Sequence, residues 1–313
     1  MSAKLSRLGF VGAGKETVQQ GTPVVPTFSL PVKAISFEDV IDTIIDDTFR
    51  GNPAVVQGVY GGASSSTGSM DGYPYPDTFG HLLAALGMTD TLGAVVGGKT
   101  PHTFKAAVTQ PPTYTLTDFD AVEAVAYPGC MLDELTVKVD MKGAVAYTAK
   151  WLGWQGVQVA TPIPVYGSLQ PFLGWQLIWT AGGVASTRVQ SSEWTFKRGV
   201  EIIPGSDGTQ GPRETFADAL DVTCKFKAIF ENRLDYDRFI AYVTHVVVGS
   251  LVQPVGNGGN RLDITISGAT CNKATRDQGQ KYAQLDCELI GSFNATDGGP
   301  AQVALLTPTA AAF

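Results

Sequence analysis

Two helical patterns with the same spacing occur half a chain apart, and they restrict the folds open to this sequence. Apolar residues recur at i, i+3, i+4 and i+7 in both, first as Phe79, Leu82, Leu83 and Leu86 and then as Tyr236, Phe239, Ile240 and Val243. Every residue of the second pattern follows its counterpart by 157 positions, so a short helix with one apolar face is predicted twice in the same register. The repetition predicts a duplicated unit.

Strand patterns repeat around the two predicted helices in the same order. Leu135 to Val139 matches Leu262 to Ile266 at a separation of 127, and Tyr147 to Gly153 matches Leu285 to Gly291 at a separation of 138. The drop from 157 to 127 gives the first copy a connection 30 residues longer, which a surface loop tolerates. We predict a mainly β chain of two tandem domains, residues 1–155 and 156–313, each with one flanking α-helix.

The region before the first predicted helix contains further strand and turn signals. Val32 to Phe37 alternates as a half-buried strand does, and Val55 to Tyr60 is also predicted to be a strand. Between them, Glu38 to Asp47 mixes apolar and acidic residues and predicts a helix or a long hairpin loop. The Gly- and Ser-rich stretch from Gly61 to Ser69 predicts a turn.

Composition limits the classes of function. The 313 residues are 44% hydrophobic and 16% charged, which is enough apolar material for two domain cores. The net charge of −7 argues against a protein that grips nucleic acid through its phosphates. No run of 18 apolar residues is present, and no signal-peptide core follows Lys4 and Arg7, so we expect no membrane span and folding in a cytoplasm.

Motifs that suggest catalysis or ligand binding are incomplete. Gly9 to Glu16 satisfies G-x-x-x-x-G-K but has Glu16 where a phosphate-binding loop needs Ser or Thr. The four cysteines and three histidines are isolated in sequence, and the aspartates between Asp39 and Asp47 lack the spacing of a calcium loop. We therefore expect no catalytic residues, metal site or cofactor. A β-sandwich carbohydrate-binding module stays open as an alternative, with the candidate stacking residues Trp151, Trp154, Trp175 and Trp179.

Three segments resemble tail tube (major tail) proteins of long-tailed, siphovirus-type bacteriophages. They are Ser36 to Gly51, the turn Tyr127 to Cys130, and Phe172 to Gln176. The resemblance spans most of the chain, and the order of features carries it more than any single motif. It implies a β-sandwich or barrel tail-tube domain with a flanking helix, long inter-ring loops and extended terminal arms. It also implies a virion structural protein that polymerises into stacked rings around a channel for viral DNA.

The length departs from the commonest pattern of that family, in which one unit per chain forms a hexameric ring. Two units per chain predict a trimeric ring with pseudo-sixfold symmetry, with the hexamer as the alternative. The resemblance implies self-assembly, with the tape measure protein and DNA in the lumen and with tail terminator and distal tail proteins as partners. It places the protein in the virion tail after assembly in the host cytoplasm. The tube of a contractile tail or of a secretion device is a second alternative.

Two segments are candidates for contact between stacked rings. The first is the long loop from Glu38 to Arg50, and its counterpart in the second half is Phe196 to Arg213. Apolar and acidic residues in the first and basic residues in the second suggest contacts between loops of opposite charge. The candidate contact residues are Ile41, Ile44, Ile45, Asp46, Asp47, Phe49, Arg50, Lys197, Arg198 and Arg213.

Overall fold

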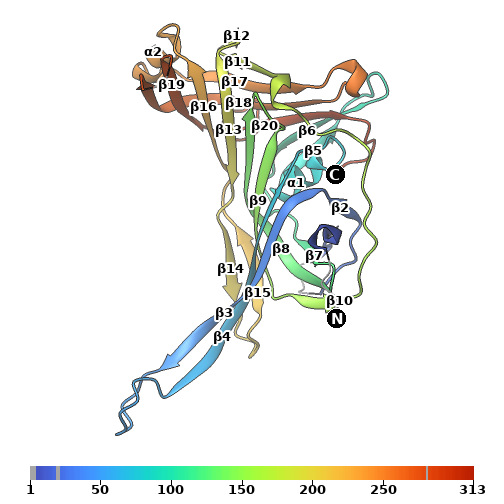
Figure 1. Cartoon of the computed structure of the whole chain (residues 1–313), viewed down its shortest axis with the longest axis vertical. Coiled ribbons are helices and arrows are strands. Elements are labelled where there is room, and N and C mark those ends of the chain that lie inside the picture. Colours follow the sequence, from blue (N-terminus) through green and yellow to red (C-terminus); the bar gives the residue numbers. More distant parts are fainter. Residues whose placement is uncertain (1–4, 19–21, 280) are drawn as a thin grey trace.

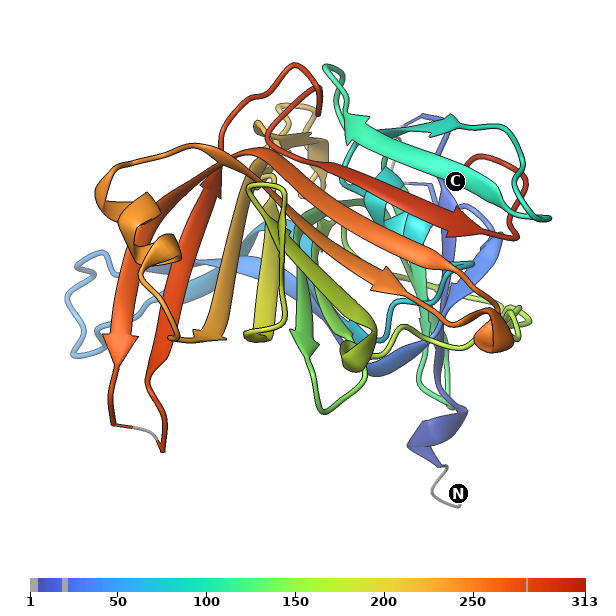
Figure 2. The same cartoon turned by 90° about the horizontal axis from the view of Figure 1, so that it is seen from above.

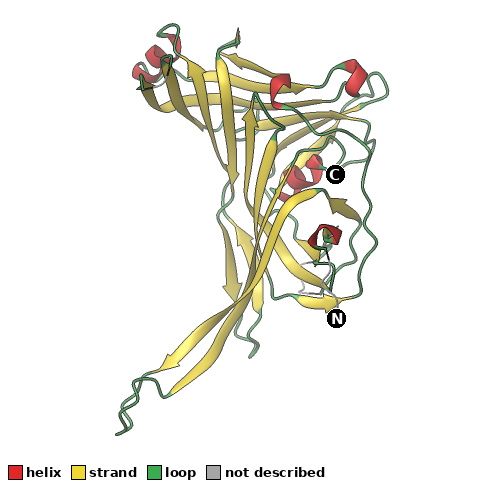
Figure 3. Cartoon of the chain, in the orientation of Figure 1, coloured by secondary structure: helices red, strands yellow, loops and turns green. Residues whose placement is uncertain are grey.

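The computed structural model describes residues 5–18, 22–279 and 281–313, and it consists mainly of antiparallel strands (Figures 1 and 3). The α-helices of the described chain are α1 (Phe79–Ala85) and α2 (Leu234–Ile240). Single turns of 3-10 helix form η1 (Ser6–Leu8), η2 (Gly174–Gln176) and η3 (Val255–Asn257). The predicted mainly β fold class is confirmed.

The strands of the first half are β1 (Phe10–Lys15), β2 (Phe28–Leu30), β3 (Val32–Asp46), β4 (Gly58–Gly72), β5 (Met88–Leu92), β6 (Thr100–Ala106), β7 (Tyr114–Phe119), β8 (Ala124–Asp140), β9 (Ala146–Gly153) and β10 (Val157–Val159). Those of the second half are β11 (Leu177–Ala181), β12 (Val184–Ser186), β13 (Val189–Lys197), β14 (Val200–Pro204), β15 (Pro212–Ala217), β16 (Asp221–Ile229), β17 (His245–Val252), β18 (Arg261–Asp277), β19 (Gln284–Gly291) and β20 (Gln302–Thr307).

Eight of these strands form one continuous sheet that passes through both halves. Its order is β3, β4, β9, β8, β13, β16, β19 and β18, and every neighbouring pair is antiparallel. The halves join where β8 pairs with β13, with Val137 opposite Trp194. Figure 2 shows these strands side by side across the molecule. We call this array the eight-stranded sheet.

Each half adds a second layer of strands to make a sandwich. The first outer sheet has the order β2, β1, β7, β8 and β10, and the second has the order β12, β11, β17, β18, β20, β6 and β5. The 17-residue strands β8 and β18 contribute to both layers. Both contain a bulge between their two halves, where a strand bends most easily, and the bulges lie between Leu132 and Glu134 and between Cys271 and Lys273.

The strand pairings of the two halves correspond closely. Bulges recur at matching positions in three pairs of ladders, namely β3–β4 and β13–β16, β8–β9 and β18–β19, and β7–β8 and β17–β18. The hairpin of β5 and β6 has no counterpart in the described second half. It accounts for much of the longer connection predicted for the first half, and it extends the outer sheet of the second half by pairing with β20.

The core follows from alternation along the strands. One face of the eight-stranded sheet lies under the outer sheets and carries buried apolar side chains such as Val137, Trp194 and Phe196. Trp194 lies beside Trp179 of the second outer sheet, with ring centroids 5.5 Å apart. In the first half Tyr114 packs edge-on against Trp151. The opposite face of the eight-stranded sheet is polar.

The two predicted helices form, but their environments differ. The α1 residues Phe79, Leu82 and Leu83 are buried, as the pattern predicts. No residue of α2 is fully buried and Ile240 is 56% exposed, although Tyr236 and Phe239 of the predicted apolar face pack partly buried against the core. The neighbours of the two helices differ: α1 lies against β5, β8 and the ring of Phe313, whereas α2 packs on β18 and is linked to Ala181 of β11 and to Arg188 through polar contacts of Arg238 and Asp235.

Three strand-level predictions need correction. Leu135 to Val139 lies in the eight-stranded half of β8, whereas Leu262 to Ile266 lies in the outer-sheet half of β18, so the separation of 127 matched unlike segments. The predicted turn from Gly61 to Ser69 is part of strand β4, paired with β3. The segments predicted as extended terminal arms, around Gly9 to Glu16 and from Asn294 to Phe313, include the sheet strands β1 and β20, whose backbone groups pair with β7 and β18. Residues 1–4 of the predicted arm lie outside the described residues.

Candidate assembly interfaces

The hairpin of β3 and β4 projects far from the rest of the molecule (Figure 1). Its outer part exposes large apolar side chains: Ile41, Ile44 and Ile45 are about half exposed, and Phe49 near the tip is fully exposed. Exposed apolar side chains gathered on one projection are typical of a contact surface. The structure thus brings together seven of the predicted contact residues, Asp46, Asp47 and Arg50 among them, within the outer part of this hairpin.

Asp46 shapes the hairpin tip. Its carboxylate accepts hydrogen bonds from the backbone N–H and the hydroxyl of Thr48, and it forms an ion pair with Arg50. The Thr48 hydroxyl, followed by the Thr48 backbone N–H, lowers the pKa of Asp46 below its ordinary value. Asp47 is exposed and accepts no hydrogen bond from the described residues. The two neighbouring aspartates therefore differ: Asp46 holds the turn, and Asp47 faces solvent.

The hairpin of β14 and β15 runs beside the base of this projection (Figure 1). Gln210 joins the two, because its backbone carbonyl accepts from the Ser64 N–H at 2.9 Å and its side-chain amide donates to the Gly61 carbonyl at 3.1 Å. Arg213 is exposed on β15, and Lys197 is exposed at the end of β13. The projecting segment 200–217 also carries Glu201, Asp207 and Glu214. The predicted segment Phe196 to Arg213 has three basic and two acidic residues, a formal charge of +1, against −4 for Glu38 to Arg50, so the contrast of charge stays a prediction.

Arg198 is a buried structural residue in the single chain. It is 6% exposed, and its guanidinium donates to the backbone carbonyls of Leu86, Gly87 and Asp218 at 2.8 to 3.3 Å. Burial lowers the pKa of Arg198 below its ordinary value. It joins the end of α1 in the first half to the second half, so it is not free to contact another ring.

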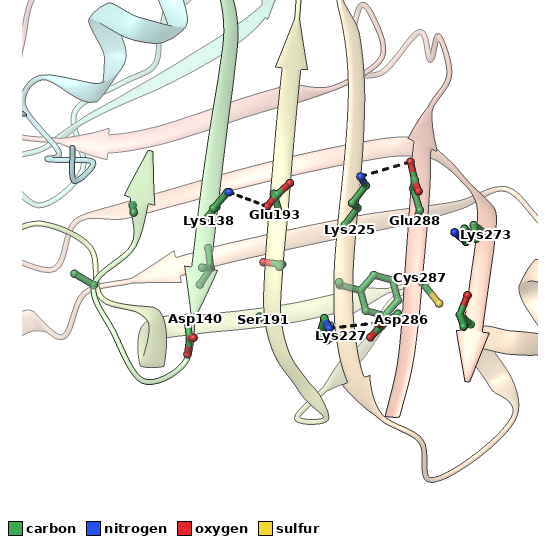
Figure 4. A pocket seen from close by; sticks show the side chains of 16 residues that line it. Lys138, Asp140, Ser191, Glu193, Lys225, Lys227, Lys273, Asp286, Cys287 and Glu288 are labelled. Atoms are coloured by element: carbon green, nitrogen blue, oxygen red, sulfur yellow. Dashed lines mark ion pairs between the residues drawn. The ribbon is translucent and has the colours of Figure 1, made fainter. Parts of the chain in front are cut away.

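The polar face of the eight-stranded sheet carries a ladder of cross-strand ion pairs (Figure 4). The pairs Lys138–Glu193, Lys150–Glu134, Lys225–Glu288 and Lys227–Asp286 have N–O distances between 2.9 and 4.0 Å. In the part of the sheet where β4 also pairs with β9, and leaving out bulge residues, this face has nine acidic residues and six lysines by strand register: Glu38, Asp71, Glu134, Asp140, Glu193, Asp221, Asp277, Asp286 and Glu288, and Lys138, Lys150, Lys197, Lys225, Lys227 and Lys273. Its formal charge is −3.

This polar face was not predicted from the sequence. Its signal was present as charged residues at i and i+2, for example Lys225 with Lys227 and Asp286 with Glu288. Such spacing places both charges on one side of a strand. Recognising a shared face, however, requires the pairing of strands that are far apart in sequence.

Both ends of the eight-stranded sheet are open edges. At one end, β3 pairs with β4 alone among the described strands. At the other, residues 270–277 of β18 pair with β19 alone, since the last pairing on the opposite side is His245 with Ala269. Open edges expose unpaired N–H and C=O groups and accept a further strand. The single chain thus has two complementary edges for other copies.

The remaining candidate motifs have ordinary structural places. Residues 10–15 of the G-x-x-x-x-G-K pattern form strand β1, and Glu16 is buried and accepts hydrogen bonds from Thr115 and Gly129. Trp151 and Trp179 are buried in the core, so the four tryptophans do not form one exposed stacking surface. Within the described ranges, no group of three or more His, Cys, Asp and Glu residues is arranged to hold a metal, and no helix is long and apolar enough to cross a membrane.

Open sheet edges, an exposed apolar projection and an ion-paired polar face are features of a β-rich subunit that assembles with other copies. Comparison with known proteins identifies the class further. The family model for phage tail tube proteins matches residues 6–308, so the chain belongs to the phage tail tube protein family. No curated protein matches the chain. The family is a structural one, and the chain is a component of the phage tail.

Proposed function

We propose that three copies of this chain close into a ring, and that rings stack into a tube whose lumen conducts viral DNA. The observation that carries this proposal is the eight-stranded sheet with its two open edges. Joining the β3 edge of one copy to the β18 edge of the next leaves no edge exposed once the ring closes. Three copies supply 24 strands to such a barrel.

The size of the barrel favours three chains. At a strand spacing of about 4.8 Å and a tilt of about 35–45°, 24 strands give a backbone diameter of roughly 45–50 Å. After side chains fill part of that width, the lumen still exceeds the width of a DNA double helix. Six chains would supply 48 strands and double the diameter, which leaves DNA far from the wall. The trimer is therefore the better fit to a DNA channel.

The correspondence between the halves supports a duplicated unit as the origin of the pseudo-sixfold ring. Bulges are rarely placed by chance, and three of them recur at matching positions. We place the boundary in the segment 160–173 between β10 and η2, a little later than the predicted 155, because β10 completes the first outer sheet. Each unit then contributes four strands to the eight-stranded sheet.

In this ring the polar face of the eight-stranded sheet lines the lumen. Four of its six lysines form ion pairs with cross-strand carboxylates, and its net negative charge repels phosphates, so DNA passes without sticking. The tape measure protein occupies the same lumen before DNA does. Terminator and distal tail proteins cover the two ends of the tube, which assembles in the host cytoplasm.

The projecting β3–β4 hairpin is the proposed contact between stacked rings. Ile44, Ile45 and Phe49 supply apolar surface, with Asp47 and Arg50 nearby, and Lys197 and Arg213 complete the proposed set. Electron microscopy of purified protein tests the proposal as a whole. We expect striated tubes whose rings contain three chains. Rings of six chains would contradict the stoichiometry, and a protein that stays monomeric at high concentration would contradict the assembly.

A further inference from the structure

The chain contains an internal junction between its two halves that can serve as a template for the junction between copies. Strands β8 and β13 meet there in antiparallel register, with Thr136 opposite Thr195 and their hydroxyl oxygens 3.4 Å apart. If the halves are repeats in a closed ring, the contact from the second half of one copy to the first half of the next has the same geometry. This step rests on the proposed trimeric ring.

Matching bulges define which residues correspond. The bulge after Val32 in β3 corresponds to the bulge after Val189 in β13, a separation of 157. The bulge between Leu132 and Glu134 corresponds to the bulge between Cys271 and Lys273, a separation of 139. Position 195 therefore corresponds to Glu38 and position 136 to Thr275.

We propose that β18 of one copy pairs antiparallel with β3 of the next in the register that places Thr275 opposite Glu38. The same register places Lys273 opposite Val40 and Asp277 opposite Ser36, so Lys273 is a diagonal neighbour of Glu38 on the polar face. On the other face Arg276 lies opposite Phe37. The guanidinium of Arg276 already lies 4.6 Å from the ring centroid of Tyr236 on α2.

The bulge residue of β8 extends the comparison from backbone pairing to side-chain contacts. The Asp133 carbonyl accepts a hydrogen bond from the Arg198 N–H, and its carboxylate accepts one from the Val200 N–H, both at 2.8 Å. The corresponding bulge residue of β18 is Asn272, which is exposed and also carries a side-chain oxygen acceptor. Its targets in the next copy are the N–H groups of Ile41 and Thr43.

In the same arrangement, residues of the next copy lie against the exposed side of helix α2. In the internal junction, Arg198 contacts the backbone at the end of α1. Position 198 corresponds to Ile41, which is 49% exposed in the single chain. Tyr242 and Val243 at the end of α2 are exposed and apolar in the same way. Ile41 of the next copy would therefore contact the apolar end of α2, at Tyr242 and Val243. In the internal junction, Arg198 instead donates to the backbone carbonyls at the end of α1.

Disulfide cross-linking tests the register. Tubes of the Glu38→Cys, Thr275→Cys double variant, assembled under reducing conditions and then oxidised, should yield covalent dimers and trimers on a denaturing gel, because opposed residues in antiparallel strands lie within disulfide range. The Thr136→Cys, Thr195→Cys variant is the matched control and should give only an internal cross-link. The Glu38→Cys, Arg276→Cys variant places the two thiols on opposite faces and should give none.

A second variant set keeps the test decisive if cysteines impair assembly. Asn272→Ala should raise the critical concentration for tube formation about threefold to tenfold, the effect of one or two lost hydrogen bonds, whereas Asn272→Asp should retain assembly as Asp133 does internally. Tubes that form without covalent dimers or trimers, or an alanine variant that assembles normally, would overturn the register and leave the trimeric tube standing. Failure of the unmodified protein to form tubes would overturn the proposed function itself.

Discussion

Arg198 shows how one side chain can hold two halves of a chain together. Its guanidinium lies between the end of α1 and the bend that leads from β13 to β14, and it donates to three carbonyls that water cannot reach easily. A basic residue beside a projecting hairpin suggested an inter-ring contact from sequence alone. Its burial indicates a structural role instead, because hydrogen bonds from a charged donor in a shielded site are stronger than those at a surface.

Replacement of Arg198 should destabilise the fold. Arg198→Ala removes the guanidinium donor from the carbonyls of Leu86 and Asp218, whereas the Gly87 carbonyl keeps the Ala107 N–H, and we expect a cost of about 2–4 kcal/mol in the free energy of unfolding. Chemical denaturation of the two proteins measures the difference. Arg213→Ala is the control, since Arg213 is exposed and its loss should change stability by less than about 0.5 kcal/mol. Equal stability of both variants would show that the buried bonds contribute nothing.

Asp118 on β7 provides a residue-scale prediction about pH. Burial, followed by the charge of Asp120, raises the pKa of Asp118 to about 6. The folded state therefore keeps the proton at pH values where the unfolded chain has lost it, and stability falls as pH rises from about 4 to about 6. Asp118→Asn should have a higher Tm than the parent above pH 6, by an amount equivalent to about 1 kcal/mol after solvent screening. Below pH 4 the difference should disappear, and a pH-independent difference would argue against the cause.

At the scale of elements, the β3–β4 hairpin separates a folding role from an assembly role. Asp46 and Asp47 are adjacent, but only Asp46 is bound within the hairpin tip. Asp47→Lys should reduce tube length or yield without a change in Tm, because it reverses an exposed charge at the proposed ring contact. Negative-stain microscopy and sedimentation measure tube length and yield.

Two comparisons make that hairpin prediction sharper. Ile44→Asp should also block stacking, since Ile44 is 56% exposed and its burial at a ring contact would become costly. Glu231→Lys makes the same kind of charge reversal at an exposed residue outside the hairpin and serves as the control. Normal tubes from both Asp47→Lys and Ile44→Asp would remove this hairpin from the stacking contact.

Elements with strong local patterns were predictable from the sequence, whereas features that depend on contacts between distant segments were not. Alternation located Tyr147 to Gly153 and Leu285 to Gly291 in the correct relation, because β9 and β19 pair with matching partners. Gly61 to Ser69 carries turn residues but is a strand, since pairing along the long β3 outweighs local preference. The exposure of α2 was not predictable either, because helical periodicity identifies an apolar face but not the surface that covers it.

At the scale of the whole molecule, the proposed ring closure and the proposed channel wall depend on the same sheet. One face of the eight-stranded sheet builds the core of both sandwiches, and the other is left with paired charges. Three copies in a ring would present a formal charge of about −9 from this face at each level of the tube. A lumen with that balance holds phosphates away, so its acidic residues determine whether DNA passes or binds.

Isosteric removal of luminal carboxylates should therefore turn a passive channel into one that retains DNA. The variant Glu134→Gln, Glu193→Gln and Glu288→Gln leaves Lys150, Lys138 and Lys225 without their ion-pair partners and brings the net charge of the described face to zero. Tubes of this variant should retain several-fold more short duplex DNA than parent tubes at about 50 mM salt, and the excess should disappear near 500 mM. Sedimentation of tubes with labelled DNA measures the retained fraction.

The control variant changes as many charges elsewhere on the chain. Glu123→Gln, Glu214→Gln and Glu231→Gln remove three exposed carboxylates outside the eight-stranded sheet, so the overall charge matches that of the luminal variant. If only the luminal variant retains DNA, the polar face meets the DNA and its lysines bind once they are unpaired. Equal retention by both variants would mean that overall charge decides, and the polar face would lose its assignment as the channel wall.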